Sequence, residues 1–567
     1  MMLTDIEISN SSHLEPIETI AAKANIKSQD LEPYGHYIAK IPLKYIQEEK
    51  MKSSRLILVT SISATKAGIG KTTVSIGLTL GLNKIGKKAM AVLREPSLGP
   101  CFGMKGGACG GGYAQVLPMD KINLHFTGDF HAITSANNMI SAMLDNYFYQ
   151  RRKEIPPLKT ILWRRVMDVN DRNLRIIETG LGGTANGLQA LSGFDITPAS
   201  EIMAILCLST SEEDLRNRID NILLGYREDG SEFLCKELGI TGSIVALLKD
   251  ALQPNLVQTT ENTPVIIHGG PFANIAHGCN SILATKMGLS LSDYVITEAG
   301  FGADLGAEKF LDIKCRQLHR LPDLVVLVAT CNGLKMHGGV EEAHIKEPNI
   351  EGLKKGFANL DQHVNNIRQW KRNIIVAFNR FANDTDEEIQ CLIEHCEKEL
   401  GVKCVINNGF LKGGEGAIDI ARTVVEEIEQ HPTCKEGQDA IYTTALKDGK
   451  PIQTIKERID AVVNKIYHAG TITYTDHALN MLEKIQADKY YWEFPVCIAK
   501  TQYSFSDDPK QYGCPKDFNF TISDIVINRG ARFIVAIAGK MMRMPGLPKE
   551  PAAKHIDVID NKIVGLS

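Results

Sequence analysis

The sequence predicts an α/β fold with a doubly wound, mostly parallel sheet and two additional α/β domains. Three observations lead to this prediction. Short runs rich in β-branched residues alternate with helical segments along the chain. A glycine-spaced loop joins one of these runs to a helix. At 567 residues the chain is also too long for a single core, and we expect about three or four domains.

Several segments have the length and composition of buried strands. They are Leu56–Ile62, Lys88–Leu93, Ile122–Phe126, Thr263–His268, Tyr294–Thr297, Leu324–Ala329, Ile374–Phe378 and Val402–Ile406. In doubly wound sheets, ligands bind beyond the carboxyl ends of the strands. We therefore expect the functional residues directly after these segments, where glycines and charged residues are dense.

The chain divides into three expected units. Residues 1–135 and 288–380 form a nucleotide-binding domain, because they hold the glycine-spaced loop and most of the predicted strands. Residues 136–287 form an inserted α/β domain, which contains the amphipathic, charged segment Asp214–Arg227. Residues 381–567 form a C-terminal α/β domain.

Composition and charge exclude several classes of partner. Lys and Arg number 63 against 67 Asp and Glu, so a net charge of -4 gives no reason to expect nucleic acid or a membrane surface. The N-terminus is acidic and polar, and no apolar run is long enough to span a membrane. The 13 cysteines have irregular spacing and no C-x-x-C pair, which is typical of reduced thiols. We expect a cytoplasmic protein.

The loop after Leu56–Ile62 predicts a P-loop-type nucleotide site. It matches G-x-x-x-x-G-K-[ST] at Gly70, Lys71 and Thr72, with Thr65 in place of the first glycine. Backbone N–H groups of such a loop surround phosphates at the start of a helix. We expect Lys71 to reach the β- and γ-phosphates of ATP and the Thr72 hydroxyl to bind Mg²⁺. The remaining loop residues in the expected site are Thr65, Lys66, Ala67, Gly68, Ile69 and Gly70.

Lys66 leaves an alternative open. It lies five residues before Lys71, where dimeric ATPases related to nitrogenase iron protein and plasmid-partition proteins carry a second lysine. Such a switch ATPase would use Lys66 across a subunit interface. The helix expected after the loop also contains Gly77 and Gly81, which cost helix stability and indicate close helix-to-sheet approach.

A glycine run favours a class of protein other than these switch ATPases. Six glycines occupy the ten positions Gly103–Gly112, with Lys105 among them. A run with so high a cost in backbone entropy persists where main chain approaches a ligand or needs positive φ. Partition ATPases have no counterpart of this run.

The motifs GMKGGACGGGY (Gly103–Tyr113) and VATCNGLKMHGG (Val328–Gly339) resemble those of formate–tetrahydrofolate ligases. The segments HGGPFANIAHGCNS (His268–Ser281) and TEAGFGADLGAEKF (Thr297–Phe310) also look like blocks of this family. The resemblance covers nearly the whole chain and is collinear. It implies ATP-dependent condensation of formate with tetrahydrofolate through formyl phosphate, giving 10-formyltetrahydrofolate, ADP and phosphate. It also implies a homotetramer, and activation by a monovalent cation such as K⁺ or ammonium.

The resemblance assigns roles to single residues. Arg94 would grip formate and then formyl phosphate, because a guanidinium matches carboxylate and acyl-phosphate oxygens. Glu95 is the candidate ligand of the monovalent cation. Asp129 is expected to orient the folate amine or the cation, and His268 could contact phosphate.

The expected folate site uses aromatic faces from the C-terminal domain. Phe381 and Phe410 would stack on the pterin by offset stacking. Phe381 matches the family pattern, whereas Phe410 stands where the family usually has tryptophan. In the glycine run, Gly106 and Gly107 are expected to approach the cofactor through their main chain.

Several positions depart from the family pattern. Residues that differ from the expected type include Lys66 (proline), Ile69 (glutamate), Asn332 (arginine), Gly333 (another small residue), Ala382 (proline), Asn383 (threonine), Lys540 (aspartate) and Arg543 (threonine). They leave open a third hypothesis, a catalytically silent paralogue that binds folate without turnover.

Overall fold

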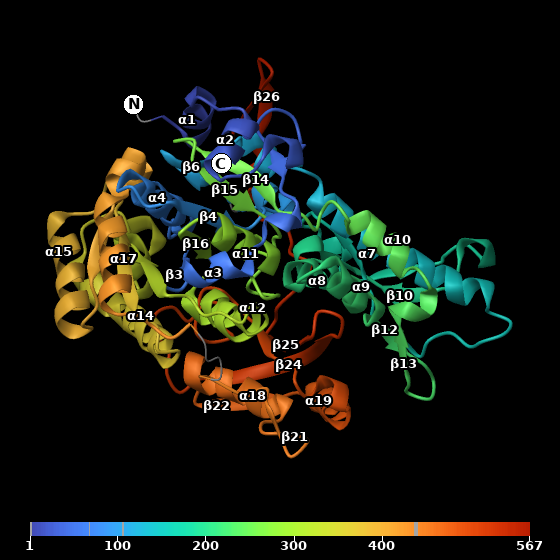
Figure 1. Cartoon of the computed structure of the whole chain (residues 1–567). Coiled ribbons are helices and arrows are strands. Elements are labelled where there is room, and N and C mark those ends of the chain that lie inside the picture. Colours follow the sequence, from blue (N-terminus) through green and yellow to red (C-terminus); the bar gives the residue numbers. More distant parts are fainter. Residues whose placement is uncertain (1–2, 67, 105–106, 436–439, 567) are drawn as a thin grey trace.

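The computed structural model describes residues 3–66, 68–104, 107–435 and 440–566. A large, mostly parallel sheet lies at its centre (Figure 1). In spatial order, its parallel strands are β15 (Pro264–Ile267), β4 (Ala89–Leu93), β16 (Tyr294–Glu298), β3 (Arg55–Ser61), β17 (Leu324–Ala329), β18 (Ile374–Asn379) and β19 (Cys404–Asn407).

Antiparallel strands extend the sheet beyond β15. Strand β14 (Asn255–Thr259) pairs with β15, with β2 (Ala39–Lys40) and with β6 (Ala114–Leu117). Strand β1 (Glu32–Pro33) pairs with β2, and β5 (Gly110–Gly111) pairs with β6. The glycine run therefore leads into this edge of the central sheet.

The parallel strands are buried on both faces. Strands β17 and β18 are buried along their whole length, as their sequences LVVLVA and IIVAFN require. Polar residues enter mainly where strands end, as with Glu298 on β16, Asn379 on β18 and Asn407 on β19. These carboxyl ends are where ligands bind in parallel sheets.

Most of the predicted strands are confirmed, but the prediction for Ile122–Phe126 is wrong. Helix α6 (Met119–Asn123) occupies the start of this segment, and Phe126 has a left-handed φ of 43°. Met119 and Ile122 are three residues apart, so both reach the core from one side of a helical turn. Strand β14 was not predicted, because three of the five residues in NLVQT are polar.

Helices cover both faces of the sheet. Helices α4 (Lys71–Lys84) and α17 (Ile418–Gln430) lie on one side, and α11 (Ile282–Leu291) and α14 (Ile350–Gln369) lie on the other (Figure 1). Further helices are α1 (Asp5–Ser11), α2 (Ile17–Lys23), α3 (Glu48–Ser53), α5 (Leu98–Phe102), α12 (Cys315–Leu318), α13 (Cys331–His337), α15 (Asp386–Glu394) and α16 (Gly409–Lys412).

The two glycines of α4 lie against different neighbours. A Cβ on Gly77 would lie 3.4 Å from Asn407 Oδ1 of β19 and 3.5 Å from Cα of Gly409, whereas one on Gly81 would overlap the carbonyl group of Ala417. The predicted close approach to the sheet therefore holds at Gly77, and at Gly81 helix α4 instead approaches the segment 409–417. That segment carries Phe410.

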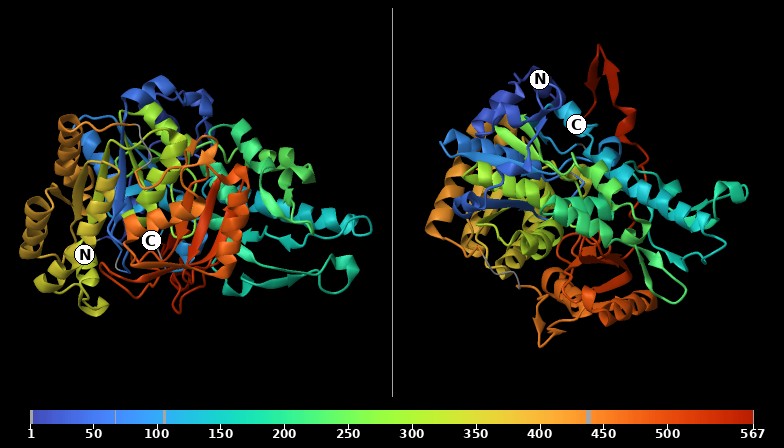
Figure 2. Two further views of the ribbon diagram at one scale, coloured as in Figure 1. Left: turned by 90° about the horizontal axis from the view of Figure 1, so that it is seen from below. Right: turned by 45° about the vertical axis from the view of Figure 1, so that its right-hand side comes forward.

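A mostly helical region projects to one side of the sheet (Figure 2). It contains α7 (Asp129–Gln150), α8 (Glu201–Leu208), α9 (Glu212–Asp220) and α10 (Thr241–Leu248). Its short strands are β7 (Thr160–Ile161), β8 (Arg165–Met167), β9 (Ile177–Thr179), β10 (Ala190–Ser192), β11 (Phe194–Ile196), β12 (Leu223–Tyr226) and β13 (Glu232–Leu234). The amphipathic segment predicted at Asp214–Arg227 is thus helical only to Asp220.

The C-terminal part forms a second sheet in the order β22 (Thr471–Tyr474), β24 (Asn519–Asn528), β25 (Phe533–Ala538) and β23 (Val496–Ala499). Helices α18 (Ile455–Val462) and α19 (Asp476–Ala487) lie beside it (Figure 2). Two short antiparallel pairs complete this part, β20 (Leu446–Lys447) with β21 (Lys450–Pro451) and β26 (Asp557–Ile559) with β27 (Lys562–Val564).

The domain boundaries at residues 135, 287 and 380 stay a prediction. Strands β14 and β15 lie between residues 136 and 287 and belong to the central sheet, as does β19 beyond residue 380. Each of the 13 cysteines is a free thiol. Within the described ranges, every helix is too short or too polar to cross a membrane.

Candidate active site

The loop between β3 and α4 is held in shape by two asparagines. Gly70 caps α4 in a left-handed conformation with φ 74°, and a Cβ there would overlap the Asn379 amide. Asn379 Nδ2 donates to the Ile69 carbonyl at 3.1 Å, and Asn407 Nδ2 donates to Asn379 Oδ1 at 3.3 Å. Side chains at the ends of β18 and β19 thus fix the loop, and the N-terminus of α4 opens beside it. Ala67 lies outside the described residues.

Four polar side chains meet at the ends of β3, β16 and β4. Lys71 Nζ donates to the Phe301 carbonyl at 3.2 Å, and Thr72 Oγ1 donates to Glu298 Oε2 at 2.9 Å. Arg94 Nη2 lies 3.8 Å from Glu298 Oε1. The structure therefore brings Thr72 and Arg94 together at Glu298, and Lys71 reaches Phe301, three residues further along the chain.

Sequence reasoning placed Glu298 directly after a predicted strand, in the expected ligand region, but gave it no role. The side chain is 1% exposed and ends β16, the strand between β3 and β4. The signal was present, because Glu298 is the first charged residue after the predicted strand Tyr294–Thr297.

The two other polar residues of the loop differ in exposure. Thr65 is buried, and its Oγ1 has no hydrogen-bond partner within the described ranges. Lys66 is exposed, and its Nζ lies 3.2 Å from Glu342 Oε2 of the same chain. Lys66 thus pairs within its own chain, whereas the switch-ATPase hypothesis needs this lysine to cross a subunit interface.

Glu95 and Asp129 form a second buried polar group. Lys40 Nζ lies 2.8 Å from Asp129 Oδ1, and Asn255 Nδ2 donates to Asp129 Oδ2 at 2.8 Å. Burial, aided by the charge of Asp129, raises the pKa of Glu95 well above its usual range. Glu95 Oε2 is buried without a hydrogen-bond partner in the described part of the chain. Burying a carboxylate oxygen without a partner costs free energy, and a cation bound to this oxygen would reduce that cost. Glu95 therefore fits a monovalent-cation ligand.

The position of His268 corrects its predicted contact with phosphate. The ring is completely buried, with Nδ1 2.6 Å from Ser281 Oγ and Nε2 2.6 Å from the Ala251 carbonyl. Burial lowers the pKa of His268 to about 4, so the ring is neutral near pH 7. Both nitrogens are engaged by protein, and the ring ties the start of α11 to the chain before β14.

The described part of the glycine run packs against protein. A Cβ on Gly107 would overlap the Asn123 side chain, and one on Gly112, where φ is 57°, would overlap the Phe410 carbonyl. The Tyr113 N–H donates to that same carbonyl at 2.8 Å. The run therefore clamps the loop that carries Phe410. Lys105 and Gly106 lie outside the described residues.

The two predicted stacking residues follow neighbouring strands. Phe381 comes after β18, and its backbone N–H donates to Asp384 Oδ2 at 2.7 Å. Phe410 comes after β19, and its ring edge lies against Gly111. Both rings are half-buried. They therefore lie at the same edge of the sheet as the loop between β3 and α4, which we call the phosphate loop.

Several departures from the family pattern contact one another. Ile69 Cδ1 would lie only 2.8 Å from a Cβ on Gly333, so a larger residue there would require this side chain to shift. Asn383 Nδ2 donates to Asn332 Oδ1 at 3.0 Å. An apolar contact and an amide pair thus join the loops where the family pattern has glutamate and arginine.

The C-terminal departures behave differently. Arg543 Nη2 lies 3.1 Å from Asp195 Oδ2, and Arg164 Nη1 lies 3.1 Å from the other oxygen of this buried carboxylate. Arg543, which stands where the family pattern has threonine, therefore has Asp195 as its ion-pair partner. Nothing in the structure explains the exposed Lys540.

Ser63 is a buried hub that sequence reasoning also missed. Its N–H donates to Asn359 Oδ1 at 3.2 Å, its carbonyl lies 2.9 Å from His337 Nε2, and its Oγ lies 3.0 Å from His363 Nε2. The Gly513 N–H donates to His337 Nδ1 at 3.2 Å. The hub therefore ties the start of the phosphate loop to α13, α14 and the C-terminal part.

Acidification should weaken the fold through His363. Burial lowers the pKa of His363 to about 4 from an ordinary 6.5, so the unfolded chain takes up the proton first. This stability is complete above pH 6.5 and is lost as pH falls through 4. Between pH 7 and 5, this residue should lower the free energy of unfolding by about 2 kcal/mol. Urea unfolding measures the free energy of unfolding at pH 7 and at pH 5. The fall in that free energy between the two pH values should be smaller by about this amount in His363→Gln.

The exposed His125 provides the control. His125→Gln should keep the wild-type difference in the free energy of unfolding between pH 7 and pH 5, because the ring is exposed to solvent in the folded as well as in the unfolded chain. An unchanged difference in His363→Gln would contradict the prediction.

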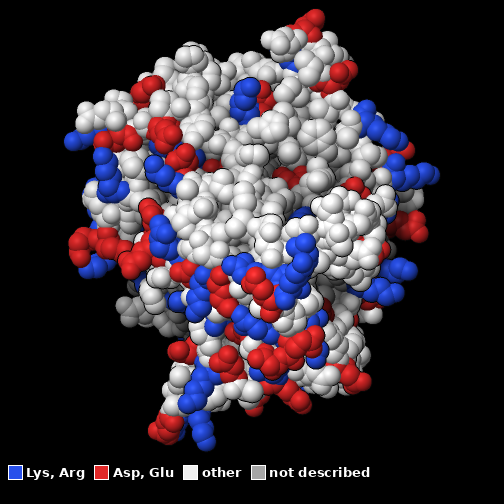
Figure 3. All heavy atoms as spheres, turned by 90° about the vertical axis from the view of Figure 1, so that its right-hand side faces the viewer, with Lys and Arg blue, Asp and Glu red and all other residues white. Residues whose placement is uncertain are grey.

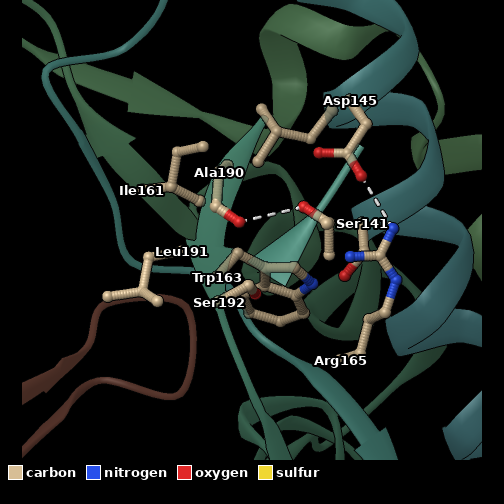
Figure 4. A pocket seen from close by; sticks show the side chains of 10 residues that line it. Ser141, Asp145, Ile161, Trp163, Arg165, Ala190, Leu191 and Ser192 are labelled. Atoms are coloured by element: carbon tan, nitrogen blue, oxygen red, sulfur yellow. Dashed lines mark hydrogen bonds and ion pairs between the residues drawn. The ribbon is translucent and has the colours of Figure 1, made fainter. Parts of the chain in front are cut away.

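Two cavities lie away from these residues. One, of about 10 Å³, is bounded by Trp163, Leu191 and the Arg165–Asp145 ion pair (Figure 4). It has room for about one water molecule. The other, of about 320 Å³, lies at the opposite ends of β4 and β16, beside Lys88 and Asp293.

Comparisons with known proteins show the family of the chain. The family model described as formate–tetrahydrofolate ligase matches residues 3–567. The formate–tetrahydrofolate ligase of Bacteroides thetaiotaomicron is 62% identical over 566 residues, covering 100% of both chains. The proteins of that name from Porphyromonas gingivalis and Pelagibacter ubique are 58% and 51% identical, over 100% and 99% of both chains. The chain therefore belongs to the formate–tetrahydrofolate ligase family.

Proposed function

We propose that this protein ligates formate to tetrahydrofolate at the expense of ATP, giving 10-formyltetrahydrofolate, ADP and phosphate through formyl phosphate. The observation that carries the proposal is the meeting of Thr72 and Arg94 at Glu298, with Lys71 on the nearby Phe301 carbonyl, at the carboxyl ends of β3, β4 and β16. Full-length similarity to proteins named for this reaction supports it.

The sheet order supports a P-loop type of nucleotide site. The strand before the loop, β3, has β16 and then β4 on one side, and β17 and then β18 on the other. The loop and the first turn of α4 therefore lie in the middle of the sheet, at the edge where ligands bind. Backbone N–H groups at this helix start suit the phosphates of ATP.

The chemistry needs a phosphate cradle. Formate is a poor acyl donor because its leaving group would be oxide. A formate oxygen attacks the γ-phosphorus and ADP leaves, and the folate amine then attacks the formyl carbon and phosphate leaves. Lys71 neutralises charge on the transferred phosphoryl group, since phosphoryl transfer depends mainly on positioning and charge stabilisation. Arg94 holds formate and then formyl phosphate by paired hydrogen bonds.

Two cations belong to the proposal. The oxygen donors at Thr72 suit Mg²⁺, which neutralises phosphate charge when bound. The partnerless oxygen of Glu95 suits a monovalent cation. Phe381 and Phe410 bind the pterin face by stacking. The free thiols fit a reducing compartment, so we place the reaction in the cytoplasm.

An omission assay tests the function. Phosphate release from ATP should require formate and tetrahydrofolate together, and should fall to background when either is left out. Release that ignores formate would instead identify a switch ATPase. Binding of tetrahydrofolate without phosphate release would identify a silent paralogue.

We further propose a homotetramer. Apolar side chains are exposed between residues 160 and 192, with Ile176 71% and Leu191 75% exposed. Figure 3 shows this side of the molecule, where a broad uncharged area lies above a densely charged lower part. Exposed apolar surface of this kind marks contact with other chains. Light scattering that gave the mass of one 62.4 kDa chain would contradict the proposal.

A further inference from the structure

Glu298 is buried where two predicted substrate-binding groups meet. Its carboxylate is 1% exposed and lies at the end of β16, with β3 and β4 on either side. One oxygen accepts from the Thr72 hydroxyl at 2.9 Å, and the other faces Arg94 Nη2 at 3.8 Å. The carboxylate therefore joins the phosphate loop to the residue expected to hold formate.

Its surroundings differ from those of a buried glutamate that stabilises the fold. Glu388 is also fully buried, and it lies 3.0 Å from Lys335 Nζ and accepts from the Asn349 N–H at 2.9 Å and the Thr385 N–H at 3.2 Å. Glu298 has one hydrogen bond and one more distant guanidinium within the described ranges. A buried carboxylate with so few partners is costly. The cost is explained if further positive charge binds beside it.

The strand position indicates which charge. In P-loop enzymes, Mg²⁺ is held by the loop Ser or Thr and by an acidic residue from another strand. Here β16 pairs directly with β3, with Glu298 opposite Val59, and the Glu298 carboxylate reaches the Thr72 hydroxyl. A hydroxyl and a carboxylate are hard oxygen donors, which suit Mg²⁺.

We propose that Glu298 is a catalytic residue that binds the Mg²⁺ of the nucleotide beside Thr72 and, through its other oxygen, orients Arg94 toward formate. This inference rests on the proposed function for its Arg94 half only. The Mg²⁺ half requires nothing more than nucleotide binding.

The variant Glu298→Gln tests the metal half. It keeps the size and can still accept from Thr72, but it removes the charge. Mn²⁺ replaces Mg²⁺ as a probe, and its binding is followed by electron paramagnetic resonance in the presence of ATP. We expect Mn²⁺ affinity to fall about 10–100-fold, while ATP binding without divalent metal changes less than about twofold. Wild-type Mn²⁺ affinity in this variant would overturn the proposal.

Glu342→Gln is the matched control. Glu342 also contacts the phosphate loop, but it is exposed and its ion pair is with Lys66 and not with Thr72. It should keep wild-type Mn²⁺ affinity, and an equal loss there would also overturn the assignment. If Glu298→Gln does not fold, Glu298→Asp takes its place, with the same expected loss because the shorter side chain withdraws the carboxylate.

The Arg94 half has its own readout. The KM for formate should rise at least about tenfold in Glu298→Gln, whereas the KM for tetrahydrofolate should stay within about twofold. An unchanged KM for formate would overturn this half. A wild-type protein that binds Mn²⁺ and ATP but ignores formate would refute the proposed function, and the Mn²⁺ comparison would still decide the metal half.

Discussion

Lys71→Ala should lower formate-dependent and tetrahydrofolate-dependent phosphate release by about 10³-fold. Lys71 opens α4 at the phosphate loop, and its Nζ reaches across to the carbonyl of Phe301, beside the end of β16. Phosphoryl transfer develops charge on the transferred group, and removing one preorganised cation costs about this factor in rate. A coupled assay of phosphate release checks the prediction, with circular dichroism to confirm folding.

Lys66→Ala is the control in the same loop. Lys66 is exposed and pairs with Glu342, so its loss should change the rate by less than about threefold. An inactive Lys66→Ala with an active Lys71→Ala would exchange their roles and revive the switch-ATPase hypothesis.

Gly81→Ala should destabilise the protein by about 2 kcal/mol, within the usual cost of overpacking. A Cβ at this position would overlap the main-chain carbonyl of Ala417, which cannot rotate away as a side chain could. The gain of about 1 kcal/mol in helix propensity is too small to offset this strain. Urea unfolding measures the difference.

Gly77→Ala is the matched control in the same helix. The added Cβ would lie 3.4 Å from Asn407 Oδ1 and 3.5 Å from Gly409 Cα, which are ordinary contacts. Gly77→Ala should therefore leave stability unchanged or raise it by up to about 1 kcal/mol. Equal losses in both variants would contradict the close approach of α4 to Ala417.

The sequence predicted those parts of the fold that depend on local pattern. Strands such as β17 and β18 are continuous apolar runs, and their burial follows from that composition. The segment Ile122–Phe126 alternates apolar and polar residues as a strand does, but Ile122 instead shares one side of a helical turn with Met119. Periodicity over five residues cannot separate these two cases.

The site was predictable where it follows one motif and not where it depends on packing. Lys71 and Thr72 were predicted because they match the phosphate-binding loop motif, and Arg94 because it ends a predicted strand and the family resemblance gives it a role. The roles of Glu298 and Ser63 arise from contacts between segments more than 200 residues apart, which no local pattern contains. For His268 the sequence suggested too much. A histidine before two glycines suggests an accessible side chain, but packing buries this ring against its partners Ser281 and Ala251.

The contact of Ile69 with Gly333 and the amide pair of Asn332 with Asn383 have an evolutionary consequence. We expect the loop after β3, the start of α13 and the turn after β18 to diverge together, because a single replacement crowds the Ile69 side chain or leaves an amide without its partner. A chimaera that imports only one of these segments from a relative should inherit a mismatch. A chimaera that imports all three segments should keep matched contacts around the loop between β3 and α4.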